Sequence, residues 1–183
     1  IVLEALNAHG AKGTFFVLGK NIAGNEEVLR KIAEGGHQIA SHSWSHPNFR
    51  EISESAVLSQ MERSMEKIQE VTGQQVTMMR PPYGATNRTS RRPLVQLDLP
   101  IILWSIDSLD WKTRSTSATV NTIVSQATNG AIVLCHDVWN TTGEAMKEVV
   151  PALIAKGFQL VTVAEMMSFR KDPIKPGWEY SHL

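Results

Sequence analysis

The sequence has almost no cysteine, no excess of charge of either sign and no long apolar run. Cys135 is the single cysteine among 183 residues, so no intrachain disulfide can form and the redox compartment stays open. Eighteen Lys and Arg residues balance eighteen Asp and Glu residues. This balance argues against a nucleic-acid or polybasic membrane partner, because both need a positive field, and it leaves room for a neutral glycan. No apolar run reaches the roughly 18 residues of a membrane-spanning helix.

The sequence also lacks an initiating methionine. It opens at Ile1 in a segment with helical periodicity, so we expect the natural beginning, with any signal peptide or anchor, to lie upstream. Apolar residues make up 42% and charged residues 20% of the chain, which is typical of a globular protein. The length predicts a single domain over 1–183, with an irregular tail over 172–183 that is rich in proline and glycine.

Short apolar runs alternate with longer amphipathic segments along the chain. We predict strands over residues 14–18, 37–41, 76–79, 101–106, 131–134 and 158–163. We predict helices over residues 1–9, 25–34, 53–71, 116–128, 144–155 and 164–169. This alternation is typical of βα units around a parallel sheet.

Two α/β architectures fit the alternation, a β/α barrel and an open doubly wound sheet. His42, Arg80, Asp107 and His136 each follow the C-terminal end of a different predicted strand, where β/α barrels build their active sites. In an open sheet such residues would cluster at one switch point. No glycine-rich phosphate fingerprint follows any predicted strand. We therefore predict the barrel.

The stretch from Ser41 to Pro47 carries two histidines, His42 and His46, four residues apart. On one helical turn this spacing puts both side chains on the same face, with Cβ atoms roughly 5–6 Å apart. Two neutral imidazoles so placed can bind one divalent metal at about 2.0–2.1 Å each. Taken alone, the pattern is more often a pair of polar residues in a surface turn.

A catalytic zinc usually takes three protein ligands and keeps an open position for water. A carboxylate is the natural third ligand beside two imidazoles. Asp107, Asp110 and Asp137 are the acidic residues near predicted strand ends, and spacing selects none of them.

His136 is a third histidine at a strand exit. It shares a face with Leu134 by the two-residue period of a strand, so both side chains can point toward the same end. A histidine near a carboxylate can titrate close to neutrality and donate a proton to a leaving group. A buried histidine with a structural hydrogen bond is an equal alternative.

Arg80, Tyr83 and Trp111 lie on predicted loops at the same end. Arg80 precedes two prolines, which stiffen the backbone and fix the direction of the following amide groups. Such a loop can form an oxyanion site, and the arginine can hold a carboxylate in a bidentate pair. The two aromatic side chains suit a groove for sugar rings. A surface arginine and simple loop packing are the alternatives.

Four stretches together resemble the polysaccharide deacetylases of carbohydrate esterase family 4, the NodB homology domain. They are Ser41-His42-Ser43-Trp44-Ser45-His46-Pro47, Arg80-Pro81-Pro82-Tyr83-Gly84, Asp107-Ser108-Leu109-Asp110-Trp111 and Leu134-Cys135-His136-Asp137. The resemblance implies an α/β fold, a distorted parallel (β/α) barrel of the NodB type. It also implies metal-dependent hydrolysis of acetyl groups on a glycan.

The resemblance gives roles to residues of the first two stretches. His42 and His46 correspond to two ligands of a divalent metal, for which Zn²⁺ is the expected ion and Co²⁺ an alternative. Tyr83 would supply a backbone N–H to the oxyanion. Arg80 would hold the catalytic carboxylate.

Residues of the last two stretches receive roles in the same way. His136 would be the general acid, and Asp110 would tune its charge. Leu134 and Trp111 would line the pocket for the acetyl group.

One motif of the family has no counterpart in this sequence. An Asp-Asp pair at the end of the first strand supplies the catalytic base and the third metal ligand in the family. We expect that pair and the first strand upstream of Ile1. The chain by itself is therefore expected to bind metal weakly and to show little or no activity.

The expected substrate is an N-acetylglucosamine polymer such as peptidoglycan or chitin. The alternatives are an acetylxylan esterase, a non-catalytic glycan-binding remnant and, last, a hydrolase of a non-sugar amide. The resemblance places the protein outside the cell or in its envelope. The sequence determines neither the metal nor the oligomeric state.

Overall fold

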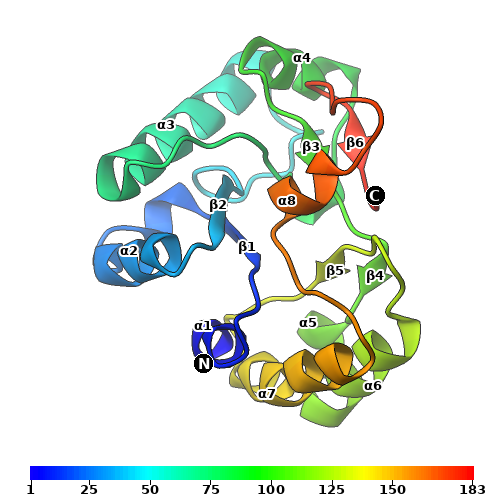
Figure 1. The fold of residues 1–183 in the computed structure, drawn as a ribbon. Helices are drawn as coiled ribbons and strands as arrows, with labels where there is room; N and C mark the ends of the chain where they lie inside the picture. Colours follow the sequence, from blue (N-terminus) through cyan, green and yellow to red (C-terminus); the bar gives the residue numbers. More distant parts are fainter. The chain divides into compact units, whose positions relative to one another are not determined.

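The structure, a computed structural model, describes all residues 1–183, and the chain divides into two compact units. The first unit comprises Ile1–Gly13, Trp104–Phe169 and Ser181–Leu183, and the second comprises Thr14–Leu103 and Arg170–Tyr180 (Figure 1). Each unit is thus built from segments that lie far apart in the sequence. None of the helices combines the length and the apolar character that crossing a membrane requires.

The second unit contains a row of parallel strands. β1 (Thr14–Val17) pairs with β2 (Gln38–Ser41). An isolated bridge at Met79 joins the end of β2 to β3 (Ile101–Ile102), which pairs with β6 (Glu179–Tyr180). The residues of these strands are mostly apolar, and Ile101 and Ile102 are fully buried, as expected for a sheet covered by helices.

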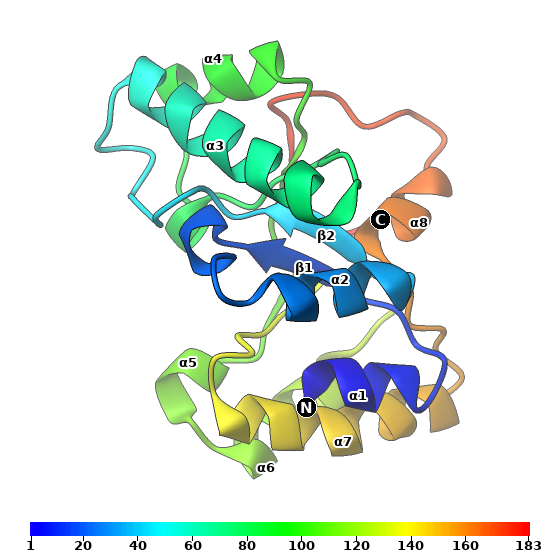
Figure 2. The same cartoon turned by 90° about the vertical axis from the view of Figure 1, so that its left-hand side faces the viewer.

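Helices of the second unit are α2 (Glu26–Glu34), α3 (Glu54–Thr72) and α4 (Arg88–Gln96), with 3₁₀ turns η1 (Gly19–Asn21) and η2 (Pro82–Gly84). α3 packs against α2 and α4, as both views show (Figures 1 and 2). It begins where the Ser53 hydroxyl accepts a hydrogen bond from Ala56 N at 3.2 Å and ends at Gly73, whose φ is 70°. Both features commonly begin and end helices.

The first unit is mainly helical. Its helices are α1 (Val2–Asn7), α5 (Asp110–Thr113), α6 (Thr116–Gln126), α7 (Asn140–Ala155) and α8 (Val163–Ser168). α7 packs against both α1 and α6, and β4 (Ile106–Asp107) pairs in parallel with β5 (Val133–Leu134). The residues after these two short strands carry the second part of the candidate site.

The predicted strand over 101–106 is wrong as a single element. Leu103 N donates to Tyr180 O at 2.8 Å, whereas Ser105 N donates to Ile132 O at 3.0 Å. The backbone therefore changes its partner strand between these residues, and β3 and β4 belong to different units. An apolar run indicates that a segment is buried, but it does not indicate which strand the segment pairs with.

Other predicted elements also differ. The strand over 76–79 is reduced to the bridge at Met79, and no strand forms over 158–163, where Thr162 caps α8. α4 was missed because Pro93 lies inside it, although Asn87 and Ser90 form a capping box at its start. The tail predicted to be irregular contributes β6, because the side-chain pattern of a two-residue strand is too short to detect.

Candidate active site

In the second unit, His42 lies directly after β2 and its ring lies against that of His46. The ring centroids are 4.9 Å apart, with the planes at 68°. His42 Nδ1 lies 2.6 Å from the carbonyl oxygen of Arg80. A carbonyl only accepts, so Nδ1 carries the proton and Nε2 is the nitrogen with the lone pair. Metal-binding histidines are commonly oriented in this way.

The segment between the two histidines is not the helical turn that the spacing suggested. Ser43 has φ of 75° and His46 has φ of 68°, so the backbone turns through the left-handed region twice. The Ser43 hydroxyl accepts from His46 N at 3.0 Å, and the Ser41 hydroxyl accepts from Ser43 N at 3.2 Å. Side-chain hydrogen bonds stabilise this unusual backbone and bring the rings together.

Gln60, on α3, holds the middle of the same loop. Its Oε1 accepts from Trp44 N at 3.0 Å and from Ser45 N at 2.8 Å, and its Nε2 donates to the Ser45 hydroxyl at 3.0 Å. Sequence reasoning missed this residue. The sequence does show that α3 has a polar contact, because Ser64, one turn further along, interrupts the apolar stripe. In the structure its hydroxyl accepts a hydrogen bond from Ser41 Oγ at 2.9 Å.

Tyr83 and Arg80 lie in the same unit as the histidine pair. The Tyr83 ring centroid is 4.7 Å from that of His46, its side chain is 69% exposed, and its φ is 60°. Arg80 is buried, so the surface-arginine alternative is wrong. Its Nε donates to Ile102 O at 3.1 Å and its Nη2 to Leu103 O at 3.0 Å. Its predicted partner carboxylate stays a prediction.

The residues present fit two of the ligand positions that a divalent metal needs. The two imidazoles lie together, and the contact of His42 with a backbone carbonyl suits a metal ligand. The structure contains no group of three or more His, Cys, Asp or Glu side chains that could hold a metal ion. A catalytic zinc usually has a third protein ligand, and that ligand stays a prediction for this site.

In the first unit, His136 and Asp110 form a hydrogen-bonded pair. Asp110 is fully buried and accepts four hydrogen bonds. The donors are His136 N at 2.6 Å, His136 Nδ1 at 2.8 Å, Trp111 N at 2.8 Å and the Thr142 hydroxyl at 2.8 Å. Thr142 was missed because the helix was predicted to begin at residue 144, whereas α7 begins at Asn140. The Thr142 hydroxyl holds the carboxylate in place.

The surroundings of Asp110 favour its charged form. Burial raises the pKa of this carboxyl, but the hydrogen bonds from His136 and Thr142 and the charge of His136 outweigh burial, so the pKa lies below its ordinary value. The charged carboxylate keeps the proton on Nδ1 of His136. The His136 side chain is 38% exposed, so a group that it can protonate has access to the ring.

The remaining candidates of the first unit differ in exposure. Leu134, in β5, is buried, whereas Trp111, in α5, is 49% exposed. Asp107 Oδ1 accepts from Leu109 N at 2.9 Å and so stabilises the turn before α5. Asp137 is exposed. No interaction in the structure assigns Asp107 or Asp137 a chemical role.

Comparison with known proteins identifies the family. The polysaccharide deacetylase family matches residues 1–102, which is more than half of the chain. The chain belongs to this family. Its solved relatives also confirm the predicted fold class, an α/β fold of the NodB type.

Three similar proteins illustrate the range of the family. The peptidoglycan-N-acetylglucosamine deacetylase PgdA of Listeria monocytogenes is 38% identical over 165 residues, covering 90% of this chain and 35% of PgdA. The solved T48 deacetylase with substrate has a TM-score of 0.92 at 30% identity, covering 98% of this chain and 88% of that one. A mutant of a carbohydrate esterase family 4 pseudoenzyme, with restored enzymatic activity, has a TM-score of 0.85 at 27% identity, covering 90% of this chain and 60% of that one. The chain spans about a third of the length of curated relatives such as PgdA.

Proposed function

We propose that the protein removes acetyl groups from a glycan polymer, with an N-acetylglucosamine polymer such as peptidoglycan or chitin as substrate. The observation that carries this proposal is the His136–Asp110 pair. A buried, charged carboxylate that fixes an accessible imidazole is useful for moving a proton. A module that only binds sugar has no need of it. Family membership and the similarity to PgdA support the choice of substrate.

His42 and His46 would hold the divalent metal, with Nε2 of His42 as its donor atom. When bound, Zn²⁺ or a similar ion such as Co²⁺ polarises an acetyl carbonyl and lowers the pKa of a bound water. Tyr83 N–H would donate to the oxyanion, because the prolines before it fix the direction of its peptide group. Arg80 would orient the carboxylate that serves as base.

His136 would protonate the departing nitrogen or oxygen. The proton leaves Nε2 as the bond between the acetyl carbon and the leaving group breaks, while Nδ1 keeps its hydrogen bond to Asp110. Asp110 stabilises the charged ring before transfer. Leu134 and Trp111 would line the space for the acetyl methyl group.

The base and the third metal ligand are the parts that this chain does not supply near the histidine pair. Two imidazoles alone bind zinc weakly compared with the three ligands of a usual catalytic site. We therefore expect the 183-residue chain by itself to show little turnover. Because its substrate lies in a cell wall or matrix, we propose an extracellular or cell-envelope location.

A glycan-binding protein without catalysis is the second candidate. The similarity to a pseudoenzyme of the same family favours it, since this fold exists in inactive form. An acetylxylan esterase is a third candidate, because O-acetyl groups suit the same residues.

Acetate release tests the proposal. The purified protein is incubated with chitohexaose, peptidoglycan or acetylxylan, with added zinc and with chelator. We expect slow, zinc-dependent acetate release from the first two substrates and its loss in His136→Ala. Binding of chitohexaose without any acetate release would favour the second candidate. Release from acetylxylan alone would favour the esterase.

A further inference from the structure

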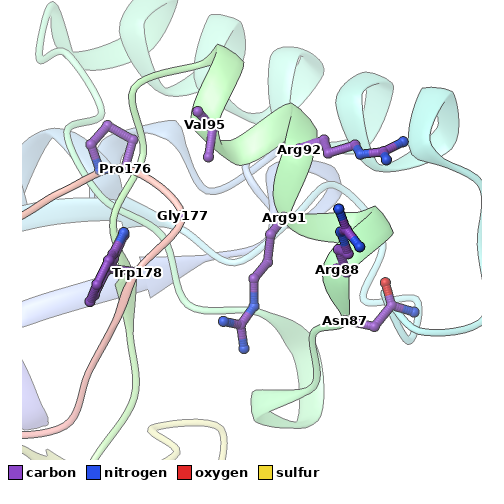
Figure 3. Close-up of a pocket in the computed structure, with 8 residues that line it drawn as sticks. All are labelled: Asn87, Arg88, Arg91, Arg92, Val95, Pro176, Gly177 and Trp178. Carbon is purple, nitrogen blue, oxygen red and sulfur yellow. The ribbon is translucent and has the colours of Figure 1, made fainter.

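A basic groove lies in the second unit, between α4 and the segment that leads into β6 (Figure 3). Its volume is about 510 Å³, within the usual range of ligand sites. Its lining residues are Asn87, Arg88, Arg91, Arg92, Val95, Pro176, Gly177 and Trp178. None of them belongs to the candidate active site.

Arginines of α4 give the groove its charge. Arg91 pairs with Glu179 and donates from Nε to the Thr86 hydroxyl at 3.0 Å, and Arg92 pairs with Glu54. The Arg88 side chain is exposed and has no hydrogen bond or ion pair in the structure. No acidic residue lines the groove itself.

Lys175 adds a further positive charge, with its Nζ 5.3 Å from the centroid of the Trp178 ring. Counting this lysine and the three arginines, four cationic side chains face the two carboxylates of Glu54 and Glu179. In a chain with no net charge, this local excess of positive charge marks a place for an anion.

Trp178 supplies a flat apolar surface beside these charges. Its side chain is 61% exposed, although its carbonyl accepts from Ile101 N at 2.8 Å and so fixes the backbone. Gly177, with φ of 72°, lets this segment pass close to α4, since a Cβ there would lie 2.5 Å from Cγ2 of Val95. The aromatic ring is therefore held at the groove and not on a loose tail.

We propose that this groove binds an acidic glycan strand, with Trp178 stacked on a sugar ring and Arg88 on one of its carboxylates. A guanidinium binds a carboxylate through two parallel hydrogen bonds, and an exposed indole offers a face to the apolar side of a pyranose. Only the choice of a glycan rests on the proposed deacetylase function. The charge and the ring follow from the groove alone.

Calorimetric titration tests the groove with three defined probes. Hexagalacturonate carries carboxylates on pyranose rings, chitohexaose carries rings without charge, and inorganic polyphosphate carries charge without rings. We expect hexagalacturonate to bind, and Arg88→Ala and Trp178→Ala each to weaken that binding by about three- to tenfold. The matched control is Arg30→Ala on α2, an exposed arginine outside the groove, which should leave the affinity unchanged.

Several outcomes would overturn the proposal. The first is equal affinity for hexagalacturonate in the wild type, Arg88→Ala, Trp178→Ala and Arg30→Ala, and the second is no binding of hexagalacturonate at all. The third is polyphosphate binding with the affinity of hexagalacturonate, unchanged in Trp178→Ala. Acetate release from chitohexaose by the same variants separates this proposal from the proposed function. Release without hexagalacturonate binding overturns only the groove, whereas binding without release leaves the groove supported.

Discussion

His42 in the second unit and His136 in the first both present Nδ1 to an oxygen, but the two oxygens differ. His42 meets a neutral backbone carbonyl at 2.6 Å, and His136 meets a buried carboxylate at 2.8 Å. A carbonyl fixes the neutral ring with its lone pair on Nε2, which suits a metal ligand. A carboxylate stabilises the charged ring, which suits a proton donor. The acceptor atom, more than the histidine itself, indicates the role.

The two regions are also held in different ways. The histidine loop of the second unit depends on side chains that support an unusual backbone, chiefly Gln60 and Ser43. The His136–Asp110 pair depends on a fully buried carboxylate with four donors. Substitutions in α3 should therefore disturb the histidine loop. The His136–Asp110 pair should instead respond to pH and to substitution of Thr142.

Replacing the proton donor should have the largest effect. We expect His136→Ala to lower kcat by about 10²–10⁴-fold, because general acid catalysis is lost, while zinc affinity stays unchanged. Steady-state acetate release and titration against a zinc chelator measure the two quantities. A variant that loses zinc affinity as well would show that the two regions do not have separate roles. His9→Ala, at the end of α1, serves as the control for loss of an imidazole.

Gln60→Ala should lower zinc affinity by about 10–100-fold, as is typical when a residue that orients a metal ligand is lost. The loop amides of Trp44 and Ser45 lose their acceptor, so the two imidazoles lose their alignment. Chelator competition measures the change. Gln69→Ala, an exposed position on the same helix, is the matched control. Equal zinc affinity in both variants would contradict a positioning role for Gln60.

Thr142→Val should cost about 1–3 kcal/mol in free energy of unfolding, since the buried carboxylate of Asp110 loses a donor while the side-chain volume is kept. Urea unfolding at neutral pH measures this difference. Thr122→Val, on α6, is the control, since its hydroxyl has no hydrogen bond in the structure. A loss of the same size in both variants would indicate a general helix effect.

The smallest expected effect is the pH dependence of the stability that Asp110 contributes. The folded-state pKa of Asp110 is lowered, so its charged form contributes stability above the unfolded-state pKa of about 4. That contribution is lost as the pH falls through the lower, folded-state value. We expect the stability difference between the wild type and Asp110→Asn to shrink below about pH 4, as urea unfolding over a pH series would show. Asp172→Asn, at an exposed position, should show no such trend. A difference that stays constant with pH would count against the assignment.

Periodicity predicted most of the long helices, because a stripe such as Val57, Met61 and Ile68 is visible in sequence and is buried in the structure. It predicted the short strands less well. The run from Ile101 to Ile106 contains two strands in different units, and only the hydrogen-bond partners reveal the division.

Strand ends also predicted the site residues, and the structure pairs His42 with His46 and Asp110 with His136. Their chemical roles stay predictions. The supporting residues Gln60 and Thr142 could not be found, because a polar side chain on a helix looks the same whether it faces solvent or a backbone amide. The four-residue spacing correctly predicted that His42 and His46 are neighbours. It did so on the assumption of a helical turn, and the backbone there is not helical.

Tyr83 keeps a backbone conformation, φ of 60°, that glycine would adopt with less strain. Its ring is largely in solvent and adds little packing, so Tyr83→Gly should raise the free energy of unfolding by up to about 1 kcal/mol. Thermal unfolding would measure that gain, and zinc-dependent turnover the accompanying loss. The substitution keeps the backbone N–H and removes the ring beside His46, so it separates what the ring contributes to turnover from what the strained backbone costs in stability.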